Sequence, residues 1–210
     1  RFNTGNVKCW GRATQGRLGD RGAPASTLPS TYPTITLPRK VLRLDAGGAN
    51  ACVVDDANDV RCWGNGLNGR AGIHGDPVNG IDVGDNEAIG AMPAVNVGGG
   101  RALVDVAVGK SSSCALTDEG RVICWGLGNA GALGRGDTED IGDDEDPGDV
   151  AVNLDVAVFT VDVGDRFACA VGVDNNVYCW GRNLNGQLGT GNRDNVGDGT
   201  GVAFIYRVAE

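Results

Sequence analysis

Short runs in which apolar and polar residues alternate are spread along the chain, and no stretch keeps the spacing of an amphipathic helix. A period of two places apolar side chains on one face of a β-strand and polar side chains on the other. Three such runs lead into Gly47, Gly109 and Gly164. They predict strands with one buried face, whose apolar positions are Leu42/Leu44/Ala46, Val104/Val106/Val108 and Phe159/Val161/Val163, with a further copy at Phe204/Tyr206/Val208.

A β-hairpin is predicted after each of the first three strands. In each copy two β-rich runs flank a polar turn, at residues 56–59, 117–120 and 174–176. The turns contain Asp, Asn or Gly, which tolerate positive φ or hydrogen-bond to their own backbone. Each hairpin ends in Cys-Trp-Gly. The chain is therefore predicted to be all-β.

All four tryptophans open the same motif, which is Trp-Gly, four residues, Gly, two residues, Gly. Its copies start at Trp10, Trp63, Trp125 and Trp180, at spacings of 53, 62 and 55 residues. Such self-similarity is the signature of a repeat architecture. We expect the tryptophans to lie in the core, beside glycines that let backbones approach closely. The motif divides a single domain into repeats at about 1–46, 47–108, 109–163 and 164–210.

Repeat length varies only in the connectors between each motif and the next strand, residues 20–41, 73–103, 135–158 and 190–203. They hold all seven prolines and 16 of the 27 acidic residues. Insertions of this kind map to loops, often on the binding face of a repeat protein. His74 lies in the second connector and is predicted to be an exposed loop residue.

Six of the seven cysteines form three pairs at the same offset of ten residues: Cys52/Cys62, Cys114/Cys124 and Cys169/Cys179. Residues ten apart face each other across these hairpins, at a Cβ separation that a disulfide can span. We therefore predict three disulfides, which indicate an oxidising compartment. The alternative is six reduced core cysteines in a cytosolic protein. A zinc site is disfavoured because close CxxC pairs are absent from the sequence.

Cys9 is the seventh cysteine and is predicted to be unpaired. At the same offset its partner would precede Arg1, so the first hairpin lacks its first strand. We expect the chain to be a fragment of a longer repeat array. The alternative is that another copy or segment completes the incomplete repeat and pairs with Cys9.

Composition narrows the function classes. Of the 210 residues 41% are apolar, enough for a core, and the 36 glycines show no collagen period. No apolar run approaches the roughly 20 residues that cross a bilayer, and no signal-peptide pattern opens the chain. The net charge of −9 repels phosphate backbones and anionic lipid. We therefore expect no nucleic-acid partner and no membrane insertion.

Carboxylates are densest in the third connector, with eight in the 13 residues from Asp137. Carboxylate oxygens at this density can bind calcium, although no EF-hand spacing appears. The candidate calcium ligands are Asp137, Asp140, Asp143, Asp144 and Glu145, and no other cofactor is expected. The alternative is a solvated acidic loop. The candidate residues for binding a protein partner are Asp85, Glu87, Asp140, Asp143 and Asp144.

No catalytic residue is predicted. The sequence contains no GxSxG, HExxH or P-loop motif, and His74 is its one histidine. Glycosidases need two carboxylates in a cleft, and here the acidic loops lack interleaved aromatic residues. Because no nucleophile, base and orienting group can be assembled, we predict that the chain is not an enzyme.

The segment GKSSSCALTDEGRVICWGLGNAGALG resembles the regulator-of-chromosome-condensation repeat, as do the segments around Trp63 and Trp180. The resemblance implies a β-propeller with four-stranded blades. Because propellers of this family usually have seven blades, about four repeats imply a partial ring. The family commonly has histidine where this chain has Asn50, Ser112 and Phe167. The paired cysteines and acidic connectors are similar to exported bacterial members, which implies a secreted, periplasmic or cell-surface bacterial protein.

Nucleotide exchange on a small GTPase, the family's best-known activity, fits poorly with disulfides and a charge of −9. Other members of the family are binding platforms. We therefore predict a non-catalytic exported module that presents variable acidic loops to a protein partner. The alternatives are a structural repeat of a surface or filament assembly and an inhibitor of a secreted hydrolase. Fold alone does not decide between them.

Overall fold

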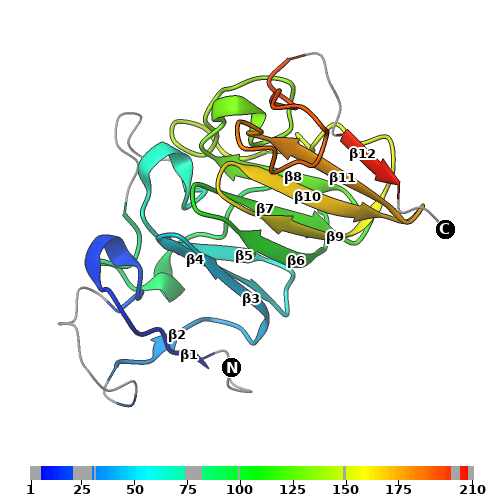
Figure 1. The fold of residues 1–210 in the computed structure, drawn as a ribbon. Helices are drawn as coiled ribbons and strands as arrows, with labels where there is room; N and C mark the ends of the chain where they lie inside the picture. Colours follow the sequence, from blue (N-terminus) through cyan, green and yellow to red (C-terminus); the bar gives the residue numbers. More distant parts are fainter. Residues whose placement is uncertain are drawn as a thin grey trace.

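Antiparallel strands form the sheets of the computed structural model, which describes residues 6–20, 30, 32–73, 82–98, 100–148, 150–199 and 204–207. Within this part of the chain the all-β prediction is confirmed, since the helical segments are short 3-10 turns. No described helix is long and apolar enough to span a bilayer. The sheets lie side by side as the blades of a partial propeller (Figure 1).

The strands group into blades in chain order. The first sheet pairs β1 (Asn6–Val7) with β2 (Ile35–Thr36). The second contains β3 (Val41–Gly47), β4 (Asn50–Asp55) and β5 (Val60–Gly64), and the third contains β6 (Leu103–Val108), β7 (Ser112–Thr117) and β8 (Val122–Gly126). The fourth contains β9 (Val158–Val163), β10 (Phe167–Gly172), β11 (Asn176–Gly181) and β12 (Phe204–Arg207). The 3-10 turns are η1 (Thr14–Gly16), η3 (Leu67–Gly69), η4 (Ile89–Ala91) and η5 (Asn129–Gly131).

At the outer edge of the blades, the described fourth blade has a fourth strand, whereas the second and third blades have a connector in its place. In the fourth sheet β12 pairs with β11, with Val177 opposite Tyr206. At the matching places in the other two blades, the Val95 N–H donates to Val60 O and the Val152 N–H donates to Val122 O, each at 2.8 Å. Among the described residues, the connector thus takes the place of a fourth strand through a single backbone hydrogen bond in each of these blades. Pro93 lies two residues before Val95 and has no N–H with which to extend the ladder.

The hairpins form in the predicted register. Cys52 lies opposite Cys62, and the other two pairs match, Cys114 with Cys124 and Cys169 with Cys179. Disulfides join all three pairs, at Cα–Cα distances of 4.1 Å. Since each bridge ties the two strands of one blade together, the hairpins are rigid supports for the loops that follow them.

Packing between blades depends on the glycines of the tryptophan motif. Gly69 has a φ of +71°, and a Cβ there would overlap the carbonyl group of Ile141 in the next blade. Gly16 meets Val83 in the same way. The motif therefore keeps glycine at this position because the following blade occupies the space that a side chain would need.

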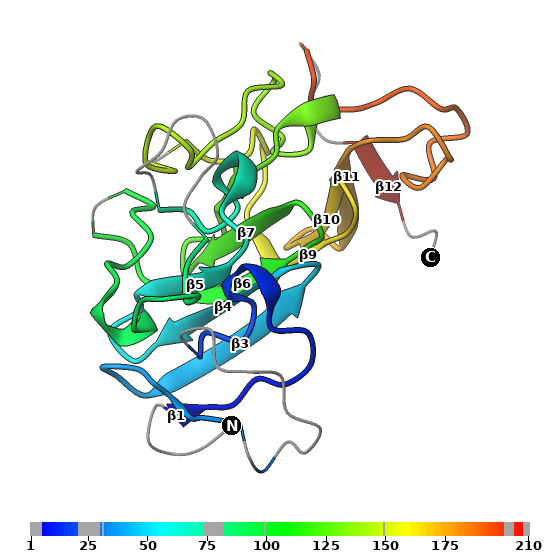
Figure 2. The same cartoon turned by 90° about the vertical axis from the view of Figure 1, so that its left-hand side faces the viewer.

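The tryptophan prediction holds for three copies and is wrong for Trp10. Trp63, Trp125 and Trp180 are completely buried, whereas Trp10 is 62% exposed. The strand before Trp10, β1, pairs only with β2 among the described residues, and Figure 2 shows it at one end of the blades. In the part of the chain that the structure describes, no hairpin strand therefore lies beside β1 to cover the indole.

The predicted alternation of buried positions is not observed at the same end of the molecule. Val106 and Val108 of β6 are buried, as are Val161 and Val163 of β9. In β3 the corresponding Leu44 is 47% exposed and Ala46 is also exposed. β6 packs against β3 and β4, and β9 packs against β6 and β7, but no preceding inner strand is described for β3. Other apolar positions of the pattern also face water, with Val104 at 40% and Phe159 at 58% exposure.

Candidate binding surface

The acidic connectors begin as regular extensions of the blades. The glycine after each buried tryptophan bridges to a valine or isoleucine of the connector, in the pairs Gly64/Val83, Gly126/Ile141 and Gly181/Val196. The paired residues exchange two N–H···O bonds of 2.7 to 3.0 Å. This contact places each connector at the end of its blade that is opposite to the hairpin turn.

A polar residue before each bridge holds the turn that follows Trp-Gly. Its side-chain oxygen accepts a backbone N–H at 2.8 to 3.0 Å. The acceptors are Asp82, Asp140 and Asn195, and the donors are Gly66, Gly128 and Asn183. A part of the connector acidity is therefore structural. The repeated Asp/Asn-Val/Ile-Gly-Asp segments at 82–85, 140–143 and 195–198 are the sequence signal for this role.

Asp140 differs from its counterparts because it also links two blades. One carboxylate oxygen accepts the Gly128 N–H at 2.8 Å, and the other accepts the side-chain N–H of Asn68 from η3 at 2.7 Å. Both oxygens are thus engaged within the chain. The Asp137 carboxylate also has a partner within the chain, because it accepts the N–H of Glu139 at 3.3 Å.

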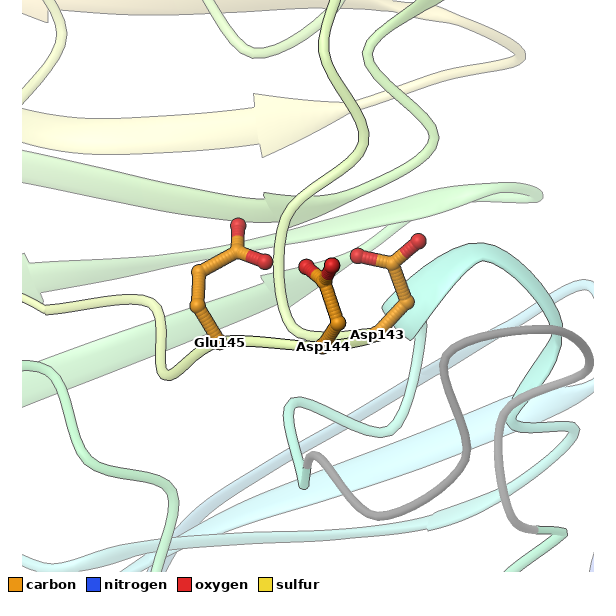
Figure 3. A group of neighbouring side chains, drawn as sticks. All are labelled: Asp143, Asp144 and Glu145. Atoms are coloured by element: carbon orange, nitrogen blue, oxygen red, sulfur yellow. The ribbon is translucent and has the colours of Figure 1, made fainter.

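Three of the five predicted calcium ligands lie together. Asp143, Asp144 and Glu145 follow the bridge at Ile141, and one carboxylate oxygen of each lies within 4.8 Å of the others (Figure 3). Asp144 is exposed, and the other two side chains are half-buried. Three oxygens are half of the smallest coordination number that calcium takes, so further ligands would have to come from water or from a partner. Calcium binding stays a prediction.

Repulsion and burial within this cluster act on Glu145. Burial raises the pKa of its carboxyl to about 7, and a hydrogen bond to Asp144 and the negative charge of Asp143 act in the same direction. In the matching loop, burial and the neighbouring Glu87 raise the pKa of Asp85. Glu87 itself accepts the Gly84 N–H at 3.0 Å and so closes its own turn. In both loops, therefore, burial and like charge disfavour the ionised form of one carboxyl.

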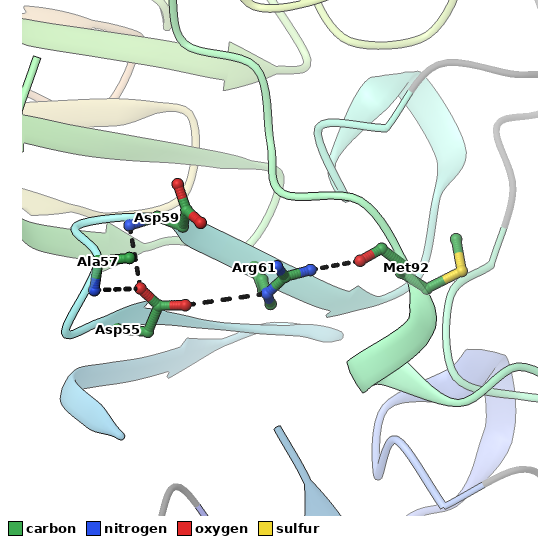
Figure 4. Close-up of polar contacts among 5 residues, drawn as sticks. All are labelled: Asp55, Ala57, Asp59, Arg61 and Met92. Carbon is green, nitrogen blue, oxygen red and sulfur yellow. Dashed lines mark hydrogen bonds and ion pairs between the residues drawn. The ribbon is translucent and has the colours of Figure 1, made fainter. Parts of the chain in front are cut away.

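The structure contains a buried polar network at the hairpin-turn end of the second blade. None of its residues is among the site residues predicted from the sequence. One oxygen of Asp55 accepts the N–H groups of Ala57 and Asp59, and the other lies 3.9 Å from Arg61 Nε (Figure 4). Arg61 donates onward to the carbonyl oxygen of Met92 in the connector. The network fixes the turn and connector of the second blade. Polar residues at two inward positions of the hairpin, 55 and 61, are its sequence signal.

A second surface opens at the incomplete end of the partial ring. A cavity of about 430 Å³ there is lined by Cys9, Trp10, Leu44 and Ala46 among others. Cys9 is the free cysteine of the described chain, and it is half-buried. Burial raises the pKa of its thiol to about 11. His74, predicted to be an exposed loop residue, lies outside the described residues, as does Asp149 at the end of the acidic connector.

Comparison with known proteins assigns the fold to a family. The profile of the Regulator of chromosome condensation (RCC1) repeat matches residues 103–132 and 160–187, and a second profile of the same repeat matches 119–171. The chain belongs to the RCC1 repeat family. The matched segments contain the second and third disulfide hairpins and most of the tryptophan motif that follows each of them.

Among curated relatives of the RCC1 repeat chain is the human E3 ubiquitin-protein ligase HERC2, which is 30% identical over 198 residues. That match covers 91% of this chain and 4% of HERC2. The ultraviolet-B receptor UVR8 of Arabidopsis thaliana is 31% identical over 158 residues, which are 75% of this chain and 33% of the receptor. The chain therefore spans a third or less of these two relatives.

Solved structures agree on the propeller. Yeast RCC1 (Prp20), in a crystal structure with Kap60, superposes with a TM-score of 0.70 at 18% identity. The superposition covers 95% of this chain and 44% of the yeast chain. Human WBSCR16 gives a TM-score of 0.66 at 22% identity, over 90% of this chain and 46% of the human one. At these identities the likeness shows the fold, and the coverage fits the predicted partial ring.

Proposed function

We propose that this RCC1 repeat chain is a non-catalytic, exported protein-binding module that presents variable acidic loops on a disulfide-stapled propeller. The observation that carries the proposal is the contrast between frame and connectors. The hairpins, buried tryptophans and bridging glycines recur with one geometry, while the connectors differ in length and hold most of the carboxylates. Loops on a rigid scaffold are where binding residues concentrate.

The relatives support a protein partner. The yeast protein of the same fold was crystallised bound to Kap60, and a second structure of it was described with its binding properties to Gsp1p and histones. A propeller of this kind therefore offers surfaces on which proteins dock. Three disulfides favour an oxidising compartment, which supports export.

Within the connectors, we assign the steering of a basic partner to Asp143 and Asp144. Their side chains lie with Glu145 at the end of the third blade, whereas the oxygens of Asp140 are engaged by Gly128 and Asn68. Negative charge on a loop speeds the encounter with a basic surface, and salt weakens the effect.

Biolayer interferometry tests this assignment, with cytochrome c as the basic probe and serum albumin as the acidic control. We expect Asp143→Asn with Asp144→Asn to slow association with cytochrome c about tenfold at low salt. Asp56→Asn with Asp59→Asn removes the same charge at the opposite end of a blade and should change the rate little. Equal rates for the wild type and both double variants would overturn the steering role.

A second candidate function is a structural repeat in an assembly, in which another copy or segment completes the first blade. The exposed Trp10 and Leu44 and the free Cys9 favour it, because their counterparts in complete blades are buried or disulfide-bonded. Sedimentation velocity without reductant tests this candidate. It predicts mass that grows with concentration and growth that stops in Trp10→Asp, whereas a wild-type monomer at every concentration would exclude it.

A further inference from the structure

A groove between the third and fourth blades lies at the hairpin-turn end, at the opposite end of the blades from the cluster of Asp143, Asp144 and Glu145. Its volume is about 400 Å³, and its lining includes Val104, Phe159 and Val173 together with the β7–β8 turn. The three apolar side chains are 40%, 58% and 63% exposed. They are contributed by β6, by β9 and by the β10–β11 turn. Together they form a small exposed apolar cluster that another molecule can contact.

The exposure of Phe159 does not depend on a missing neighbour. Val104 occupies the same place in β6 that Phe159 occupies in β9, one residue after the first residue of the strand. The fourth blade lies directly beside β6, and Val104 is nevertheless 40% exposed. This position of the blade therefore faces water even where the next blade is present.

Val173 lies at the same turn position as its counterparts in the other two hairpins, but its side chain is apolar and theirs are acidic. The corresponding turn residues are Asp56 and Asp118, and both are exposed like Val173. A hairpin turn accommodates aspartate here without difficulty, so folding does not require valine. At 63% exposure the apolar side chain of Val173 is available for contact with another molecule.

The charged residues that line the groove indicate what kind of partner it fits. Asp118 and Glu119 belong to the groove lining, and the Glu119 side chain is 65% exposed. Arg101 pairs with Glu119 at 3.6 Å, but no lysine or arginine is among the described residues that line the groove. A second copy of a chain with a net charge of −9 would bring like charge to this acidic rim. A basic segment would find complementary potential there.

We propose that the groove formed by Val104, Phe159 and Val173 docks an extended segment of a partner protein, in which a large apolar side chain is flanked by lysine or arginine. The apolar side chain would fill the space between Val104 and Phe159, beneath Val173. The basic side chains would reach Asp118 and Glu119. This surface goes beyond the proposed function, which rests on the connectors at the other end of the blades.

The test uses methyl and amide NMR with a blocked synthetic peptide, Gly-Lys-Lys-Leu-Trp-Leu-Lys-Lys-Gly, and a matched peptide in which glutamate replaces lysine. We expect the basic peptide to shift the signals of Val104, Val173 and their neighbours, and the acidic peptide to shift none of them. Val173→Asp carries the residue found in the other two turns and should fold normally. It should weaken binding of the basic peptide about tenfold.

Leu184→Asn is the matched control, because Leu184 is 51% exposed outside the groove and Asn129 holds the same place in the third blade. It should leave binding unchanged. The proposal is overturned if the peptide shifts no groove signal, if Val173→Asp binds as tightly as the wild type, or if the groove signals shift with protein concentration alone. Since the connector carboxylates take no part, failure here is distinct from failure of the steering test.

Discussion

The Asp55 carboxylate lies 3.9 Å from the Arg61 guanidinium at the turn end of the second blade, with side chains only 2% and 13% exposed. In the third blade, Thr117 and Ile123 occupy the same two places, and the Thr117 hydroxyl accepts the Arg121 N–H much as Asp55 accepts that of Asp59. The charged pair is therefore not the only arrangement that closes such a turn, since the third blade uses a hydroxyl and an apolar residue at the same two places.

Removing one member of the pair should cost more than replacing both. We expect Arg61→Ala to lower the free energy of unfolding by about 3 kcal/mol, because it leaves the Asp55 charge buried without its partner. The double variant Asp55→Thr with Arg61→Ile copies the third blade and should lose much less. Urea unfolding under non-reducing conditions measures both, and equal losses would show that the ion pair itself is the stabilising unit.

The disulfides should stabilise the blades mainly by restricting the unfolded chain. Each bridge joins cysteines ten residues apart. Replacing Cys114 and Cys124 together with alanine should therefore lower the free energy of unfolding by about 2–3 kcal/mol. Thermal and urea unfolding of the variant, compared with the fully reduced wild type, measures the share of one bridge. A variant as stable as the wild type would contradict the prediction.

Much of this architecture could be predicted from the sequence, because local spacing determines it. An offset of ten across a polar turn places Cys52 opposite Cys62 whatever surrounds the hairpin. The register and all three disulfide pairings follow in the same way. The glycines of the tryptophan motif likewise signal the close approach of the next blade, as Gly69 shows with Ile141.

Burial could not be predicted as well, since it depends on a neighbouring blade. Leu44 and Val106 occupy the same place in their strands, yet the first is 47% exposed and the second 4%. The link that Asp140 makes to the neighbouring blade also depends on tertiary contacts, although the repeated segments at 82–85, 140–143 and 195–198 do signal its role in the turn. Asp140 is distinguished from Asp143 by the Gly128 and Asn68 groups that reach it, and these lie 12 and 72 residues away.

The half-buried thiol of Cys9 gives a prediction for labelling. Burial raises its pKa to about 11, so the reactive thiolate is scarce near neutral pH. We expect one alkylated cysteine per denatured, unreduced chain and very slow labelling of the native chain at about pH 8, with the native rate rising roughly tenfold per pH unit. Mass spectrometry after timed alkylation measures this. Fast native labelling near neutral pH would contradict the burial of Cys9.

Asp140 and Asp143 should respond differently to loss of charge. Asp140→Ala removes the acceptor for Gly128 and for Asn68, and leaves the turn N–H without a partner. We expect a loss of about 1–3 kcal/mol in the free energy of unfolding. Asp143→Asn should change stability by no more than about 0.5 kcal/mol. Chemical denaturation of the two variants in parallel tests the distinction, and equal losses would argue against a structural role for Asp140.

Glu145 should make stability depend on pH between about 4.5 and 7. Its pKa is raised to about 7 in the folded chain from 4.5, so the folded state favours the protonated carboxyl. The stabilisation is therefore complete below about pH 4.5 and is lost as the pH rises through about 7. Glu145→Gln cannot ionise, and its melting temperature should fall less than that of the wild type over this range. Calorimetry across the range measures both proteins, and parallel curves would contradict the prediction.

Calcium offers a further comparison at about pH 8. If Asp143, Asp144 and Glu145 hold the ion, calcium should raise the melting temperature of the wild type more than that of Glu145→Gln, whereas equal responses would indicate a solvated loop.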